Sequence, residues 1–144
     1  MRKGNRALRA KTVEGIASKV VIAACAASAG AHGGLVPEHL REDPRLGIAF
    51  ILAVVLLLGA VAALTIRAGD RRVAQVAALL LAGLILSWAA SRTTGIPFLQ
   101  PQPESVDAVG VVTNLVEALG LALALWLSQS MGGRWRPTSQ EVSR

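Results

Sequence analysis

The sequence predicts an all-α integral membrane protein, a bundle of four transmembrane helices. Three observations predict this class: 53% of the 144 residues are hydrophobic, only 17% are charged, and the mean hydropathy is +0.51. Soluble domains usually carry about 25% charged residues. We expect a single transmembrane domain over residues 13–131. Its four expected spans are residues 13–31, 46–66, 73–91 and 108–131.

The first span, residues 13–31, is the least apolar of the four, because Glu14 and Lys19 leave only residues 20–31 uncharged. Small side chains recur in it at helical spacing, and such rows let helices approach closely in lipid. We therefore expect the other three helices to cover it. One such row is Ala23, Ala27 and Ala31.

The second and third spans are the clearest. Residues 46–66 are uncharged over 21 positions, and at a rise of about 1.5 Å per residue about 20 such residues cross the hydrocarbon core. Residues 73–91 are a second uncharged run, with Trp88 near the end as an interfacial anchor. Only residues 67–72 separate the two runs, so they should form an antiparallel hairpin.

The fourth span, residues 108–131, contains the most informative polar residue of the chain. Glu117 lies about 13 Å into this helix, close to the expected midplane. Asp107, Asn114 and Glu117 share one helix face, and we call these three residues the polar stripe. A carboxylate at this depth indicates a function unless it only fixes helix packing. Lys19, the only basic residue at comparable depth, is the candidate partner of Glu117.

The basic residues predict the orientation, because Lys and Arg in short loops near the spans mark the cytoplasmic side. They gather in the arm 1–12, the loop 67–72 and the tail 132–144. We therefore expect both termini inside, with a disordered tail, and the loops 33–45 and 92–107 outside. A nucleic-acid partner is not expected, since the basic residues form no single face. Twelve arginines against three lysines, with abundant alanine, are typical of high-GC bacteria, so we expect a bacterial plasma membrane.

The lone cysteine excludes an intramolecular disulfide. Residues 20–25, VVIAAC, are similar to a bacterial lipobox ending at Cys25, and a cleavable signal is an alternative to a first span. Lys19 interrupts the apolar run that such a signal needs, which favours the plain interpretation of Cys25 as a small buried residue. Cleavage would reduce the helix count from four to three.

Glycine and proline break the segment between the first two spans. Pro37 suits the first position of a helix and Pro44 ends it, so residues 37–43 should form a short helix on the outer surface. Gly33 and Gly34 should let the chain fold back and bring the end of the first span toward the same surface.

Both histidines of the chain lie in this segment. His32, Glu38 and His39 are a ligand set that zinc or copper(II) accepts. Their spacing matches no established metal motif, and the alternative is a set of solvated side chains with local ion pairs.

Arg92 lies at the outer end of the third span, whereas the basic clusters of the chain are expected on the cytoplasmic side. A carboxylate partner would explain it and would tie the two outer loops together. The alternative is an interfacial arginine that snorkels. The candidate partners are Glu38, Glu42, Glu104 and Asp107.

Four features together resemble a group of small uncharacterised four-helix membrane proteins of actinobacteria. They are a first span ending in a histidine, PEHLRED before a long apolar helix, SRTTGIP closing the third helix, and an acidic fourth helix. The resemblance extends over residues 13–130. It implies the four-span layout and no activity, since the group has no established function.

Three classes of function are open. The first is a non-enzymatic protein, either an accessory subunit or one that binds a metal ion or a proton at the outer face. The second is a small oligomeric transporter or ion pathway along the polar stripe. The third, a membrane oxidoreductase, is disfavoured because two histidines on one side suit no bis-histidine haem. No nucleophile-base pair or cofactor fingerprint supports catalysis. The expected partners are the lipid bilayer and either further copies of the chain or a larger membrane complex.

Overall fold

The computed structural model describes residues 2–132, with side chains for residues 10–131. It consists of four helices, each with a stretch that is long and apolar enough to cross a membrane. They are α1 (Arg2–Glu42), α2 (Pro44–Ile66), α3 (Arg71–Thr93) and α4 (Ala108–Gly132). The prediction of an all-α chain with four helices that could span a membrane is therefore confirmed for the described residues. The orientation stays a prediction, and the predicted tail lies almost wholly outside the described residues.

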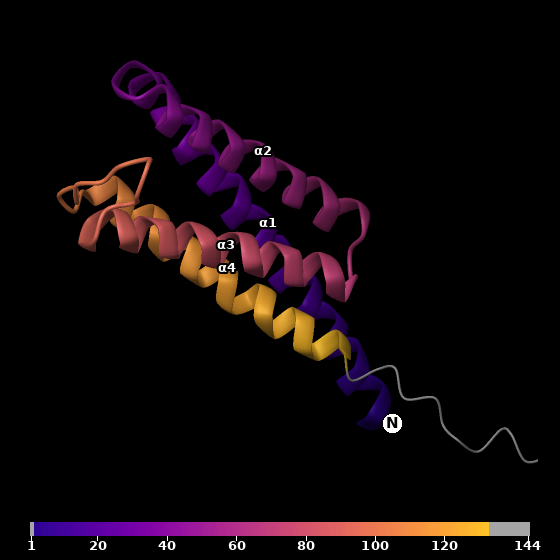
Figure 1. Ribbon diagram of the computed structural model, residues 1–144. Helices are drawn as coiled ribbons and strands as arrows, with labels where there is room; N and C mark the ends of the chain where they lie inside the picture. Colours follow the sequence, from indigo (N-terminus) through magenta and orange to yellow (C-terminus); the bar gives the residue numbers. More distant parts are fainter. Residues whose placement is uncertain (1, 133–144) are drawn as a thin grey trace, which may run out of the picture.

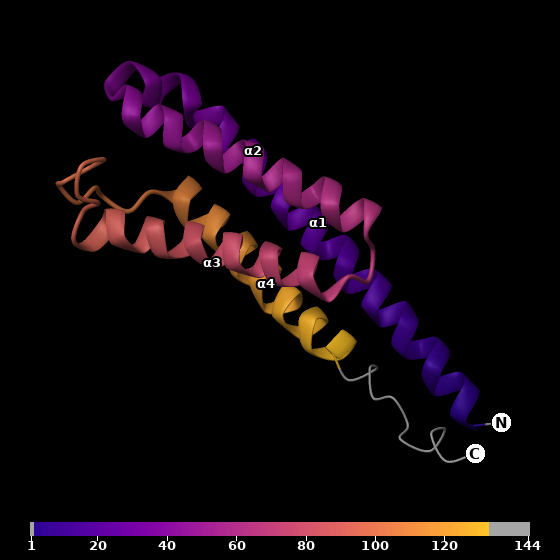
Figure 2. The ribbon, with the colours of Figure 1, turned by 45° about the vertical axis from the view of Figure 1, so that its right-hand side comes forward.

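The helices form two antiparallel hairpins, α1 with α2 and α3 with α4, which pack against each other through α1 and α4. Helix α1 packs along α2 and α4, α3 packs along α4, and α2 and α3 touch less than any of these pairs. The first span therefore packs mainly on two helices rather than under all three others. The turn between α1 and α2 and the loop between α3 and α4 lie at one end, which we call the loop end (Figures 1 and 2). Helices α2 and α3 diverge toward it.

The prediction of a separate short helix over residues 37–43 is wrong, because α1 continues through Pro37 to Glu42. Each glycine costs about 1 kcal/mol in a helix, and proline costs more. The helix continues because its last turns pack on α2, where the rings of His39 and Phe50 lie 4.2 Å apart. A backbone that leaves the helix within a bilayer would also lose its internal hydrogen bonds. The fold-back expected at Gly33 and Gly34 does not occur.

An aspartate precedes each of the three later helices and accepts a hydrogen bond from its first turn. The backbone N–H groups of Arg45, Arg72 and Gly110 donate to these side chains at 2.8, 2.8 and 2.7 Å. Such bonds satisfy N–H groups that the helix itself leaves free. The capping residues are Asp43, Asp70 and Asp107.

The core lies where the four helices meet, below the loop end. Val21, Cys25, Leu57, Leu81 and Leu127 are all buried there. The burial of Cys25 agrees with its interpretation as a small packed residue. Large apolar side chains cover the outside of the bundle, as expected for helices that face lipid.

Candidate functional site

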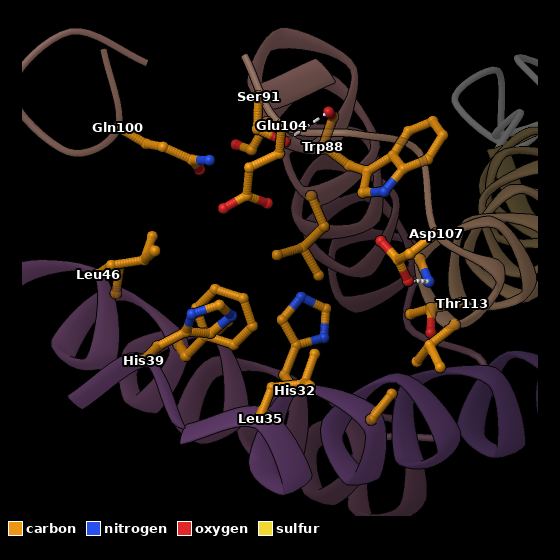
Figure 3. Close-up of a pocket in the computed structure, with 18 of the residues that line it drawn as sticks. His32, Leu35, His39, Leu46, Trp88, Ser91, Gln100, Glu104, Asp107 and Thr113 are labelled. Carbon is orange, nitrogen blue, oxygen red and sulfur yellow. Dashed lines mark hydrogen bonds between the residues drawn. The ribbon is translucent and has the colours of Figure 1, made fainter. Parts of the chain in front are cut away.

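A pocket of about 480 Å³ opens between the helices at the loop end (Figure 3). All its lining residues come from one half of the bundle. They lie within residues 31–42 of α1, 46–53 of α2, 84–92 of α3, 96–104 of the loop and 107–117. The divergence of α2 from α3 therefore leaves a space that reaches from the loop end down to Glu117.

The α1 wall carries both histidines, which project from one face of the helix into the pocket (Figure 3). His32 and His39 flank the ring of Phe50 from α2, with centroid distances of 5.3 and 4.2 Å. Glu38 also lines the pocket and is exposed. Within the described residues, no three His, Cys, Asp or Glu side chains are grouped to hold a metal ion. The structure thus brings the predicted ligand set to one pocket without forming a metal site.

Glu117 lies deepest in the α4 wall and is 1% exposed. The Ser28 hydroxyl donates to Glu117 Oε1 at 2.6 Å across the contact between α1 and α4. His32 Nδ1 lies 2.9 Å from the Ser28 carbonyl oxygen and 3.4 Å from the Ser28 hydroxyl oxygen. Because a carbonyl oxygen only accepts, Nδ1 carries the hydrogen in that contact. A chain of polar atoms thus connects Glu117 with the pocket.

The structure does not place Lys19 beside Glu117. Lys19 is exposed and lies nine residues before Ser28, about 13 Å along α1. In a bilayer its long side chain can reach the interface rather than the core. The buried carboxyl group is therefore bonded to a hydroxyl rather than to the expected ammonium group.

Arg92 joins the end of α3 to the start of α4. Its guanidinium donates to Glu104 and, at 2.7 Å, to Asp107 Oδ2, and it lies 5.8 Å from the ring centroid of Trp88. Both carboxylates belong to the loop that follows α3, so Arg92 does not tie the two outer loops together. Glu42 instead lies 3.7 Å from His39 Nδ1.

The polar stripe lines the pocket along α4. The Gly110 N–H and then the Arg92 guanidinium hold the pKa of the Asp107 carboxyl below its ordinary value, although burial acts in the opposite direction. Asn114 Nδ2 donates to the Gly110 carbonyl at 3.0 Å, while Asn114 Oδ1 is buried without a partner. An acceptor therefore remains unused one turn above Glu117.

Ser28 and Phe50 are site residues that the sequence analysis missed. Ser28 carries the only described hydrogen bond to Glu117 from another helix, and Phe50 packs between the histidines. A serine in a row of small residues and a phenylalanine in an apolar run give no distinguishing signal. The spacing of Ser28 and His32, four residues apart on one helix, is the one clue that the sequence offers.

No protein-family model, curated protein sequence or solved structure matches the chain. The resemblance to actinobacterial membrane proteins therefore stays a prediction.

Proposed function

We propose that this chain is a non-enzymatic membrane protein that binds a proton at Glu117, inside the pocket at the loop end. One observation carries the proposal: Glu117 is 1% exposed within a span, and its described partner is an uncharged hydroxyl. A charged group at such depth costs about 3 kcal/mol unless it is neutralised or reaches water. No described ion pair includes Glu117. A proton on Glu117 removes this cost.

The contacts around Glu117 offer a route for that proton. The route into the site runs from His32 Nδ1–H, at the pocket, to the Ser28 hydroxyl oxygen, whose own hydrogen passes on to Glu117 Oε1. Histidine exchanges protons near neutral pH and suits the outer step. The other titratable or charged groups that face the pocket are Glu38, His39 and Glu42 of α1, Arg92 of α3, and Glu104 and Asp107 before α4, while α2 contributes none.

The shape of the pocket favours binding over conduction. Below Glu117 the described helices close on buried apolar side chains, among them Leu81, Ala124 and Leu127. A pathway along the polar stripe would need a continuation through this packing. A pocket closed at Glu117 instead suits a group that takes up and releases a proton on one side.

Replacing Glu117 by glutamine is expected to abolish this proton uptake while preserving the fold, because the amide has the same shape and still accepts from Ser28. Infrared difference spectra between acid and alkaline buffer should contain the C=O stretch of a protonated carboxyl in the wild type. The component of that band that belongs to Glu117 should be absent from Glu117→Gln and retained in Glu42→Gln, which removes the component of an exposed carboxyl. An unchanged band in Glu117→Gln would contradict the proposal.

We further propose that the loop end faces the outside of a bacterial plasma membrane, as the distribution of basic residues indicates. In a Cys25→Ala background, an impermeant maleimide added to intact cells should label Gln102→Cys. Ala68→Cys, in the turn between α2 and α3, should react only after permeabilisation. Both positions are exposed, so accessibility does not separate them. The reverse labelling pattern would invert the topology.

A further inference from the structure

We propose that the pocket binds a protonated organic amine, with its ammonium group at Glu117 and Asn114 and its apolar body against Phe50. This inference rests on the proposed function, because the amine would occupy the place where Glu117 exchanges its proton. The charge of the wall, its unused acceptor and its apolar surface support it independently.

The wall carries an excess of carboxyl groups. Five carboxyl groups line the pocket against one guanidinium, and Arg92 is already held by two of them, Glu104 and Asp107. Three carboxyl groups remain, and Glu117 is the only buried one among them. Because a charge pair is strongest where water is excluded, a cation should bind at Glu117 rather than at the exposed rim.

The unsatisfied buried polar atoms gather at this pocket. Within residues 10–131, four buried side-chain atoms lack a hydrogen-bond partner, and all four belong to residues that line this pocket. They are His39 Nδ1, Trp88 Nε1, Arg92 Nε and Asn114 Oδ1. Buried polar atoms are normally paired with protein, water or ligand.

Asn114 Oδ1 decides what kind of cation fits. It is an acceptor, and it lies three residues from Glu117 on the same helix face. An ammonium group with N–H bonds can donate to Asn114 and pair with Glu117 together, whereas a quaternary ammonium has no hydrogen to donate. Trp88 Nε1 lies against the α4 backbone, where a Cβ on Gly110 would be 2.5 Å away, so this donor belongs to the wall.

The rest of the pocket suits an apolar body. Leu35, Leu46, Phe50, Leu84 and Leu99 line it. Small-molecule sites combine such surfaces with few polar groups, and the volume of about 480 Å³ lies in their usual range. An amine with an aromatic or branched hydrocarbon group fits this combination better than a bare metal ion does.

Calorimetric titration of the full chain in lipid nanodiscs tests the inference, with empty nanodiscs as the blank. The probes are 2-phenylethylammonium, 2-phenylethanol and phenylacetate, which are similar in size and carry positive, no and negative charge. We expect the amine to bind at least about tenfold more tightly than either of the others. Equal binding of the amine and the alcohol would overturn the inference, since partition into an apolar space would then explain both.

The variants locate the ammonium group. Glu117→Gln and Asn114→Leu should each weaken amine binding, by about tenfold or more for Glu117→Gln, and should leave alcohol binding unchanged. Glu14→Gln, which changes a carboxyl outside the pocket, should bind as the wild type does. Wild-type affinity in Glu117→Gln would overturn the inference. Loss of amine selectivity beside a normal infrared band of Glu117 would reject the ligand alone, whereas loss of the band would reject the proton site.

Discussion

Replacing Gly120 by leucine is expected to lower the free energy of unfolding by about 3 kcal/mol. A Cβ at Gly120 would lie 2.9 Å from Ala24 Cβ and 3.1 Å from Leu81 Cδ1. Helix α4 therefore cannot accept even the first carbon of a side chain without moving away from α1 and α3. The better helix propensity of leucine offsets only about 1 kcal/mol, so overpacking decides the sign.

Gly83→Leu is the matched control, because a Cβ at Gly83 would have no neighbour within 4 Å. It makes the same change of residue in a helix surface that faces lipid, and its stability should stay the same or rise by up to about 1 kcal/mol. Unfolding by SDS in mixed micelles, followed by circular dichroism, compares the two. Equal stability of both variants would contradict the close approach of α4 to α1.

The spans could be predicted from the sequence because the bilayer imposes their length. Helices α2, α3 and α4 begin and end within two residues of the predicted spans, since a charge or a turn residue stands at each boundary. Helix α1 could not be predicted in the same way. Its glycines and Pro37 are signals for a break, but packing on α2 decides the outcome, and that contact joins residues distant in the sequence.

The residues of the pocket could be predicted only in part. Glu117 and Asp107 could be identified because a carboxyl group in or beside a span needs a reason wherever the helices lie. Their partners could not, because Ser28 meets Glu117 only when α1 lies against α4, and no periodicity in either helix specifies that pairing. Lys19 is the more obvious partner for Glu117 because it carries a positive charge. The register between α1 and α4 instead places the Ser28 hydroxyl at Glu117.

Replacing Arg92 by methionine is expected to lower the free energy of unfolding by about 2 kcal/mol. The guanidinium side chain is 12% exposed, and its partners Glu104 and Asp107 are 43% and 48% exposed. Breaking a fully buried pair costs about 3–5 kcal/mol, and an exposed pair contributes about 0–1 kcal/mol. The intermediate exposure places the expected effect between these limits. Arg45→Met, at an exposed position, should stay within about 0.5 kcal/mol of the wild type.

The pH dependence of stability separates the ion pair from the packing of the Arg92 side chain. Because the pKa of Asp107 is lower in the folded chain than its ordinary value, its ionised form stabilises the fold above about pH 4. This contribution should be lost as the pH falls through the folded-state pKa. The loss should be smaller in Arg92→Met, where only backbone N–H groups, chiefly that of Gly110, still favour the ionised form, and absent in Asp107→Asn.

A double-mutant cycle between Arg92→Met and Asp107→Asn then measures the coupling of the two side chains. We expect the two effects on unfolding in mixed micelles at neutral pH to be less than additive by about 1 kcal/mol. Additive effects, together with an unchanged loss of stability in acid in Arg92→Met, would mean that backbone N–H groups alone, chiefly that of Gly110, stabilise the charge of Asp107. The loop between α3 and α4 would then depend on the pairing of Arg92 with Glu104, and the pocket wall would keep its shape when Asp107 is protonated.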